Sequence, residues 1–462
     1  MINYLIQIKR VFAGCIIISS ILTVGRSIAQ SYKPNIVIIM ADDLDSRQLS
    51  SYGGQNIQTT NIDALASEGL KFNQMIASEA MCIPTRASLF TGLYPATSGA
   101  YQNHKSVHND LKSIVHYLAD LGYRVGLTGK DHTTKPENVF PFEIIPGFEP
   151  NCVAGTDEYY LDSVKTFIER SENPYCLFVM SINPHAPWTV GDPSEFNADS
   201  LILPPHWVDT KLTRAQFTKY LAEVRRLDNQ VGDMMNLLKE TGQDQNTVVI
   251  FLGEQGPQFP GGKWTLYDNG QRSSMIIKWP GKIKPNIETD AIVQYEDITP
   301  TLINIAGGKE IKGLDGKSFV NVIEGKSEKH REYAYGIHNN IPEGPPYPIR
   351  SIRNYDYKLI LNLTPDKKYY IKYMMDPENK KNAYSTWLDK AKDDEGAKFL
   401  TDRIAVKPAI EFYDLKNDPY ELENLAEKRE HQADIKKMRS NLEKWMKQQG
   451  DTGANMDTPF KR

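Results

Sequence analysis

The sequence reads Asn35-Ile-Val-Ile-Ile-Met-Ala-Asp-Asp43 close to its N-terminus. After Asn35, residues 36–40 form an unbroken apolar run rich in β-branched side chains, and such runs are typical of a strand that is buried on both faces. Three similar runs follow along the chain, at 123–128, 175–182 and 247–252. Together the four runs predict a mainly parallel sheet in the interior of the protein.

Helix-like stretches separate these runs, at 62–68, 85–91, 111–121, 159–169 and 213–239. Because strands and helices alternate, the sequence predicts an α/β fold in which a large, mainly parallel sheet is sandwiched by helices. The length of 462 residues suits one large domain and a smaller one.

The pattern changes after about residue 340. Strand-like segments around a turn occupy 350–363, another strand is expected at 409–415, and a charged helix at 432–448. We therefore expect the main α/β domain to span 30–340, and a smaller C-terminal α+β subdomain with an antiparallel sheet to span 341–462. The polar stretch 379–402 is expected to be a surface insertion.

The N-terminal segment has the pattern of a secretory signal. Lys9 and Arg10 end a positive region, and the apolar stretch 11–24 is too short for a comfortable membrane span. Since 27–29 has a small-x-small pattern, we expect residues 1–29 to be a signal peptide that is cleaved after Ala29. The mature protein is then expected to be periplasmic or secreted, with no transmembrane anchor. A lipoprotein site at Cys15 is disfavoured because few apolar residues separate it from Arg10.

Composition narrows the classes of partner. The formal net charge is -4, so no strongly basic field is available for binding nucleic acid. Cleavage of the signal leaves three cysteines, Cys82, Cys152 and Cys176, and an odd count leaves at least one thiol without an intramolecular partner. Cys152 and Cys176 could pair, or Cys176 could be a buried thiol within its apolar run.

Polar side chains follow each of the four predicted strands. They are Asp42 and Asp43, then Lys130 and His132, then His185, and finally Glu254 and Gln255. Open α/β sheets bind ligands beyond the carboxyl ends of their strands. The sequence therefore predicts that these residues meet at one edge of the sheet.

Cys82 opens the segment Cys82-Ile-Pro-Thr-Arg-Ala-Ser-Leu-Phe-Thr-Gly92. Pro84 is suited to the first turn of a helix, which would place Cys82 just before a helix N-terminus that favours an anion. Arg86 adds a fixed positive charge. From these features alone, a structural and a functional cysteine are about equally good interpretations.

The segment Cys-x-Pro-x-Arg followed by Leu-x-Thr-Gly resembles the signature of the sulfatase family. That resemblance implies that a maturation enzyme oxidises Cys82 to formylglycine, whose hydrate is the nucleophile. Thr85 stands where the family usually has Ser or Ala, and the hydroxyl is retained.

The segment 34–43 is similar to the family's first metal-binding strand, and 251–256 occupies the place of the second. The resemblance implies that Asp42, Asp43, Glu254, Gln255 and position 82 hold a divalent cation. The family usually has Asp followed by Asn or His where this chain has Glu254 and Gln255, so each donor is retained on a longer side chain. Carboxylate and amide oxygens suit Ca²⁺ or Mg²⁺, and we expect Ca²⁺.

Three further motifs resemble the family's sulfate-binding residues: Gly129-Lys-Asp-His132, Asn183-Pro-His-Ala-Pro-Trp188 and the segment 259–267. The resemblance implies that Lys130, His185 and Lys263 contact the sulfate together with Arg86, and that His132 steers the hydroxyls at position 82. His185 is the candidate acid toward the leaving group. The substrate is then a sulfated oligosaccharide or polysaccharide.

Finer matches at 129–142 and 348–353 resemble the heparan N-sulfatase (sulfamidase) branch, so both O-sulfate and N-sulfate are open as the bond that is cut. Two other interpretations are a phosphatase or phosphonate hydrolase of the alkaline phosphatase superfamily, and a catalytically inactive protein that binds sulfated glycans. Trp188, Trp264 and His104 are candidates for the sugar subsites, and Arg47 and Lys105 for contacts with acidic groups of a polymer.

Overall fold

The computed structural model describes residues 33–170 and 173–457, so the predicted signal peptide lies outside the described residues. Within the described residues, nine strands form one sheet. In sheet order the strands are β4 (Glu143–Ile144), β3 (Arg124–Gly129), β5 (Tyr175–Met180), β1 (Asn35–Met40), β6 (Thr247–Leu252), β7 (Arg272–Lys278), β2 (Leu70–Ile76) and β8 (Ile287–Thr289), with β9 (Val293–Gln294) also pairing with β2. The four predicted strands are present, and β3, β5, β1 and β6 run parallel side by side.

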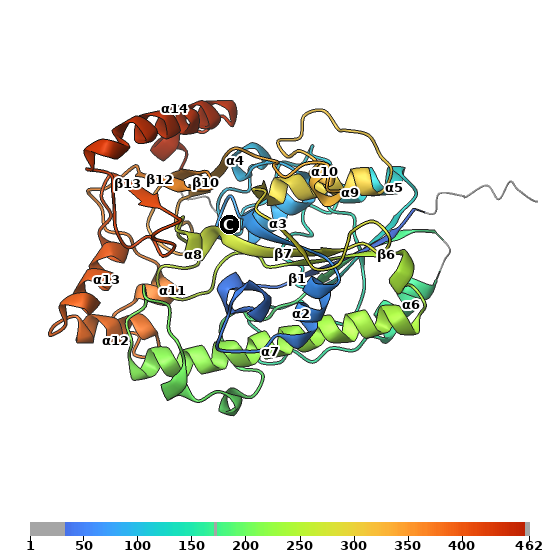
Figure 1. Ribbon diagram of the computed structural model, residues 1–462, viewed down its shortest axis with the longest axis horizontal. Coiled ribbons are helices and arrows are strands. Elements are labelled where there is room, and N and C mark those ends of the chain that lie inside the picture. Colours follow the sequence, from blue (N-terminus) through green and yellow to red (C-terminus); the bar gives the residue numbers. More distant parts are fainter. Residues whose placement is uncertain (1–32, 171–172, 458–462) are drawn as a thin grey trace, which may run out of the picture. The chain divides into compact units, whose positions relative to one another are not determined.

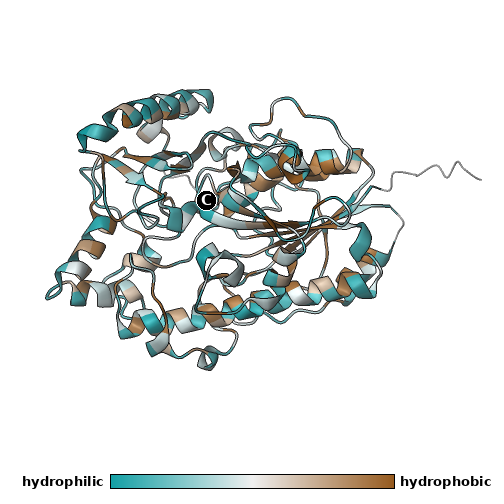
Figure 2. Ribbon diagram, in the orientation of Figure 1, coloured by the Kyte–Doolittle hydropathy of each residue, from teal (hydrophilic) through white to brown (hydrophobic). Residues whose placement is uncertain are grey.

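Both faces of this sheet are buried, as the apolar runs predict. On β1, Val37 and Ile39 pack with residues of α2 (Thr60–Ser67), α6 (Asp162–Glu169) and α7 (Lys211–Glu240). Ile36 and Ile38 face the opposite side and pack with residues of α3 (Cys82–Thr91), α5 (Ile114–Asp120) and α9 (Ile298–Ile305). Figure 1 shows the two helical layers on either side of the sheet, and Figure 2 shows the apolar character of the strands between them. The predicted sandwich is therefore confirmed.

Five strands of this sheet were not expected from the sequence: β2, β4, β7, β8 and β9. β7 is antiparallel to both of its neighbours, β6 and β2, so the sheet is mixed at this side. In β2 the pairing register shifts between Phe72 and Met75, and the polar residues Asn73 and Gln74 lie at the shift. This irregularity interrupts the alternation by which a strand is recognised in a sequence.

The predicted C-terminal antiparallel sheet is also present, in the order β10 (Ala334–His338), β11 (Ile349–Arg353), β12 (Tyr357–Asn362) and β13 (Ile410–Asp414). The predicted charged helix is α14 (Gln432–Gln448), whose Ile435, Met438, Leu442 and Trp445 pack with this sheet. All of β10 precedes residue 340, so this sheet includes a strand from the range 30–340 that was predicted for the main domain. The division of the chain into 30–340 and 341–462 stays a prediction.

The polar stretch 379–402 is helical, and its assignment as a surface insertion stays a prediction. It forms α12 (Ala383–Lys390) and most of α13 (Glu395–Ala405). Trp387 is fully buried, and its indole N–H donates a hydrogen bond of 2.8 Å to the Thr213 hydroxyl at the start of α7. Thr386 and Thr210 also share a hydrogen bond of 2.8 Å, so α12 is fixed against α7. Short helices α4 (Pro95–Ser98), α8 (Asp268–Gln271), α10 (Val320–Ile323) and α11 (Lys372–Met375) complete the fold.

A buried ion pair ties the antiparallel sheet to the chain that follows α14. The guanidinium of Arg350 donates to both carboxylate oxygens of Asp451, at 2.5 and 3.0 Å, and both side chains are fully buried. We expect Asp451→Ala to lower the free energy of unfolding by about 3–5 kcal/mol, because Arg350 loses its closest carboxylate while it stays buried.

Chemical denaturation measures this loss. The matched control is Glu443→Ala, which removes the exposed Arg439–Glu443 pair on α14 and should change stability by less than about 1 kcal/mol. Equal losses in the two variants would contradict the expected result.

Candidate active site

The four parallel strands deliver their polar residues to one edge of the sheet. Asp42 and Asp43 follow β1, Lys130 follows β3, His185 follows β5, and Glu254 and Gln255 follow β6. Cys82, at the start of α3, and Lys263, in the chain before α8, reach the same edge.

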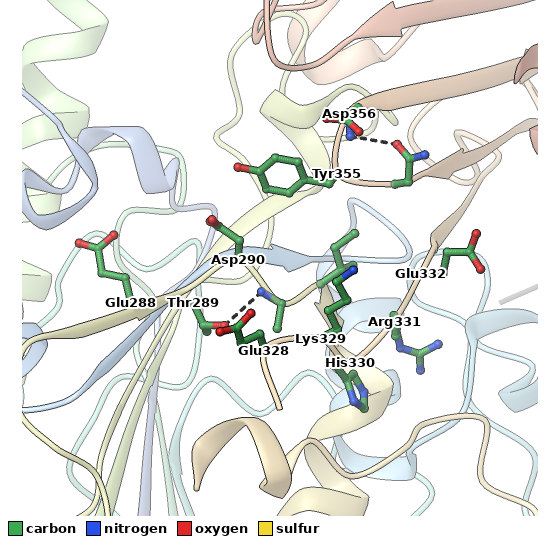
Figure 3. Close-up of a pocket in the computed structure, with 13 residues that line it drawn as sticks. Glu288, Thr289, Asp290, Glu328, Lys329, His330, Arg331, Glu332, Tyr355 and Asp356 are labelled. Carbon is green, nitrogen blue, oxygen red and sulfur yellow. Dashed lines mark hydrogen bonds between the residues drawn. The ribbon is translucent and has the colours of Figure 1, made fainter. Parts of the chain in front are cut away.

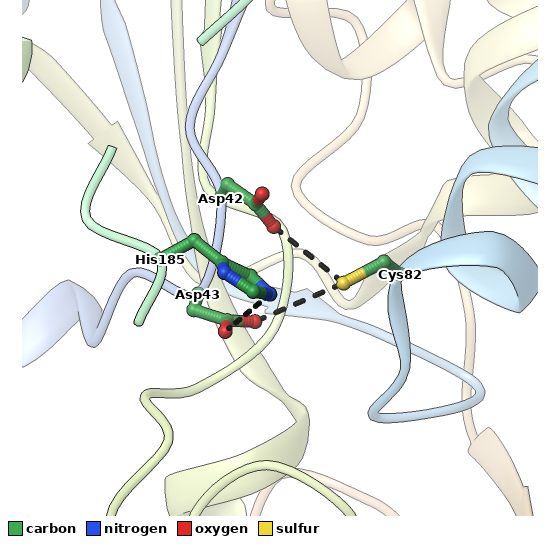
Figure 4. A group of neighbouring side chains, drawn as sticks. All are labelled: Asp42, Asp43, Cys82 and His185. Atoms are coloured by element: carbon green, nitrogen blue, oxygen red, sulfur yellow. Dashed lines mark hydrogen bonds and ion pairs between the residues drawn. The ribbon is translucent and has the colours of Figure 1, made fainter. Parts of the chain in front are cut away.

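Asp42, Asp43, Cys82 and His185 form a tight cluster, in which one ligand atom of each residue lies within 4.8 Å of those of the others (Figure 4). The Cys82 thiol lies 3.5 Å from Asp42 Oδ1 and 3.9 Å from Asp43 Oδ1. His185 Nε2 lies 3.6 Å from Asp43 Oδ2. Two carboxylates, a cysteine and an imidazole from three separate segments therefore face one point.

Cations surround the carboxylates. Lys130 Nζ contacts Asp42 Oδ2 at 2.5 Å, and Lys263 Nζ contacts Asp43 Oδ2 at 2.8 Å. Arg86 Nε donates to Glu254 Oε1 at 2.5 Å. Lys130, Lys263 and Arg86 are all buried, and a buried charge requires this kind of pairing.

Gln255 connects the second acidic segment to the first. Its amide NH₂ donates to Asp43 Oδ1 at 2.6 Å and to Glu254 Oε2 at 2.8 Å, and lies 3.4 Å from the Cys82 sulfur. The amide oxygen of Gln255 is buried and has no hydrogen-bond partner among the described residues. Asp42, Asp43, Glu254 and Gln255 are thus gathered beside Cys82, not scattered.

His132 lies at the edge of this network. Its Nε2 is 3.4 Å from the Cys152 sulfur, and its ring centroid is 6.3 Å from that of His104. Cys82, Cys152 and Cys176 are all buried free thiols, so Cys152 and Cys176 do not pair in this structure.

The backbone around the site adopts conformations that side chains rarely favour. Asp43, His104 and Trp264 have φ values of 60°, 62° and 67°. Gly129 has φ of 86°, and a Cβ at that position would lie 2.1 Å from the carbonyl oxygen of Met180. Strained backbone of this kind is found where the surrounding structure fixes functional groups in place.

The position of Cys82 differs slightly from the prediction. Cys82 is the first residue of α3, and Met81 is the N-cap, so the cysteine lies within the first helical turn and not before it. Pro84 is tolerated there because the N–H groups of the first turn have no partner within the helix.

Burial and neighbouring charges set the protonation states. Burial raises the pKa of Asp42, but the charges of Lys130 and His185 outweigh it and hold that pKa below its ordinary value. Burial and the charge of Glu254 raise the pKa of the Cys82 thiol. Burial and the charges of Lys130 and Arg86 lower the pKa of His132 to about 2, so this imidazole is neutral near pH 7.

A cavity of about 470 Å³ opens onto the cluster, and we call it the active-site pocket. Of the predicted site residues, Cys82, His132, His185 and Lys263 line it, as do the candidate sugar-contacting residues His104 and Trp264. Its other lining residues were not predicted as site residues, although Ala186 and Pro187 belong to the motif 183–188; they are Asn103, Asn151, Cys152, Val153, Ala186, Pro187, Gln258, Glu343 and Tyr373. Trp188, Arg47 and Lys105 are not among the lining residues.

Glu343 illustrates why these residues were missed. It is 3% exposed, accepts a hydrogen bond of 2.6 Å from Asn103, and lies outside every motif of the sequence analysis. No spacing or strand end points to it in the sequence, because only the tertiary structure brings it to the pocket.

A larger cavity, of about 640 Å³, lies elsewhere and is shown in Figure 3. Its lining carries five carboxylates, on Glu288, Asp290, Glu328, Glu332 and Asp356, and they outnumber its two cations, Lys329 and Arg331. Those negative charges make it unsuitable for an anionic substrate, so the active-site pocket is the better candidate despite its smaller volume.

Known proteins place the chain in one family. The family model described as Sulfatase matches residues 34–308, and the model described as N-sulphoglucosamine sulphohydrolase, C-terminal, matches residues 261–405. The chain is 32% identical to an ulvan-active sulfatase of Formosa agariphila, over 92% of this chain and 82% of that protein. It is 25% identical to human N-sulphoglucosamine sulphohydrolase, over 89% of each chain.

A solved structure agrees with the fold. The complex of BT4656 with its substrate D-glucosamine-2-N,6-O-disulfate has a TM-score of 0.71 and 20% identity to this chain, covering 92% of this chain and all of the other. The chain belongs to the sulfatase family, near its sulfamidase-like branch, and it is a sulfatase.

Proposed function

We propose that this sulfatase is an exported enzyme that removes sulfate from a sulfated oligosaccharide or polysaccharide, with formylglycine at position 82 and a divalent cation, Ca²⁺ in preference to Mg²⁺. One observation carries the proposal: three buried carboxylates and three buried cations meet at Cys82, below a pocket of about 470 Å³. In the part of the chain that the structure describes, no helix has the length and apolar character needed to cross a bilayer. A formylglycine-generating enzyme is the partner that maturation requires.

The donor set fits a hard cation. Asp42 and Asp43 offer carboxylate oxygens that lie close together, and Glu254 offers another beside Gln255. Gln255 offers an amide oxygen that has no hydrogen-bond partner among the described residues. The three negative charges of these carboxylates balance the three positive charges of Arg86, Lys130 and Lys263. A bound divalent cation would therefore give the site a net positive charge that attracts a sulfate group. Bound there, the cation would offset negative charge and lower the pKa of a hydroxyl at position 82.

The chain's own residues complete the chemistry. Formylglycine supplies, as its hydrate, a hydroxyl nucleophile that cysteine lacks. Arg86, Lys130 and Lys263 are pre-organised around position 82, and they are the groups that would bind the sulfuryl oxygens and stabilise their developing charge. His185 would donate a proton to the leaving oxygen or nitrogen, and His132 would orient the hydroxyls at position 82.

A second candidate is cleavage of N-sulfate from glucosamine. It is favoured by the match of residues 261–405 to the C-terminal model of N-sulphoglucosamine sulphohydrolase and by the likeness to the human enzyme of that name. The likeness to an ulvan-active sulfatase favours an O-sulfated polysaccharide instead.

A substrate screen tests the proposal. Matured enzyme is incubated with sulfated oligosaccharides of ulvan and of heparan sulfate, with N-sulfated glucosamine, and with 4-nitrophenyl sulfate and 4-nitrophenyl phosphate, and released sulfate or phosphate is measured. We expect release of sulfate from at least one sugar and a rate on the phosphate ester lower by 10-fold or more. Faster phosphate release would favour a phosphatase, and glycan binding without sulfate release would favour a non-catalytic protein.

A further inference from the structure

A second cavity, of about 480 Å³, adjoins the active-site pocket, and we call it the neighbouring hollow. The two cavities share four lining residues: Ala186, Pro187, Gln258 and Tyr373. Tyr373 on this common wall is 53% exposed, so its ring offers a large apolar surface between the two cavities. Aromatic faces of this kind stack on the apolar faces of sugar rings. A chain of linked sugars could therefore pass from one cavity to the other.

The charge of the neighbouring hollow is positive. Its lining includes Lys219 and Lys381 and contains no Asp or Glu. Both lysines are exposed, and neither ammonium group forms an ion pair within residues 33–170 and 173–457. By contrast, Lys390 and Lys392 at the end of α12 both pair with carboxylates. Two unneutralised cations in one hollow of a protein with net charge -4 indicate an anionic occupant.

The carboxyl group of Glu223 on α7 does not cancel these charges. Glu223 is 2% exposed. It accepts hydrogen bonds from the backbone N–H groups of Thr189 and Val190, and Thr189 lines the hollow. Its carboxylate is thus turned toward the backbone. A third cation, Lys372, lies over the Tyr373 ring at 4.7 Å from the centroid, close to the common wall.

The walls of the hollow are held in place by contacts between distant segments. The Gln216 side chain on α7 donates a hydrogen bond of 2.6 Å to the backbone carbonyl of Lys381. The Trp188 ring stacks on Phe259 at 4.7 Å, and its indole N–H donates to the Pro184 carbonyl. α12 is fixed to α7 by Trp387 and Thr386, and Figure 1 shows α11 and α12 beside the N-terminal end of α7. A pre-formed site binds with little cost of ordering.

We infer that the neighbouring hollow is a second sugar subsite, which binds an anionic unit of the same glycan chain whose adjoining unit presents its sulfate at position 82. The inference rests on the proposed function and names its substrate class: a glycan of at least two units with an acidic group on the second unit. Lys219 and Lys381 bind the sulfate or carboxylate of that unit, and Tyr373 stacks on a sugar ring.

The first test compares substrates. In the double variant Lys219→Gln/Lys381→Gln, kcat/KM for a sulfated tetrasaccharide should fall about 10-fold, mainly through KM, because two charge-assisted contacts are lost. Its kcat/KM for the matching sulfated monosaccharide should stay within about 2-fold of the parent value. The control is Lys436→Gln/Lys444→Gln, which removes two exposed lysines of α14 and should change neither value. Equal effects on both substrates, or no effect on the tetrasaccharide, would overturn the inference.

A binding measurement separates this inference from the proposed function. Calorimetric titration with a heparin hexasaccharide needs no turnover, and the double variant should bind it about 10-fold more weakly than the parent, with a smaller dependence on salt. If no substrate releases sulfate but this difference is found, the proposed function fails and the subsite stands. Equal binding by the parent and the double variant overturns the subsite. The substitutions leave the Gln216 hydrogen bond intact, because it ends on the backbone carbonyl of residue 381.

Discussion

Replacing Cys82 with alanine should reduce turnover of a sulfated sugar by at least about 10⁴-fold, because the variant has no side chain that can become the nucleophile. The fold should persist. Cys82 is a small residue in the first turn of α3, where alanine is well tolerated, and Arg86, Lys130 and Lys263 keep their carboxylate partners.

Initial rates of sulfate release measure the effect, and circular dichroism with thermal unfolding checks that the variant is folded. Mass spectrometry of the active parent enzyme should show formylglycine in the peptide that contains position 82. Near-normal activity of Cys82→Ala, or full activity from an enzyme whose cysteine is wholly unmodified, would refute the proposed chemistry.

Removal of divalent cations should lower activity by roughly 10³-fold, since the positive charge that offsets the sulfuryl oxygens would be reduced. Ca²⁺ should restore activity more fully than Mg²⁺. The longer side chains of Glu254 and Gln255 suit the flexible coordination of Ca²⁺ better than the strict octahedral geometry of Mg²⁺.

Thermal unfolding gives a second measure that does not depend on activity. Ca²⁺ at 100 times its dissociation constant should stabilise the fold by about 2.7 kcal/mol and raise the melting temperature. The variant Asp42→Asn, which removes one carboxylate charge from the proposed cation site, should show a smaller thermal shift with Ca²⁺. An enzyme that keeps full activity in excess chelator and shows no thermal shift with Ca²⁺ has no such site.

Much of the main sheet and of the site could be predicted because both depend on local signals. The runs at β1, β3, β5 and β6 are apolar on both faces, so each strand and the polar residue at its end can be recognised without knowledge of its neighbours. β2 could not, because its register shift places Asn73 and Gln74 within the strand. A strand with an interrupted alternation resembles a loop in the sequence.

The helices of the stretch 379–402 were not predicted, for a different reason. Its polar composition reflects the exposed faces of α12 and α13, and few apolar anchors, such as Trp387 and Tyr384, attach it to the core. Glu343 and Tyr373 could not be predicted as site residues either. Their place in the active-site pocket depends on contacts between segments far apart in the chain, for which no local pattern exists.

The order in which the chain is synthesised gives the burial of Cys82 a further meaning. In the folded protein this cysteine is 2% exposed, and the groups that enclose it include Glu254, Gln255 and Lys263, which leave the ribosome long after it does. A nascent chain thus carries an accessible Cys82 for the whole interval before its covering segments exist. The proposed oxidation of Cys82 to formylglycine would therefore have to take place before folding ends, and a folded chain that missed it would have to unfold locally before it could be activated.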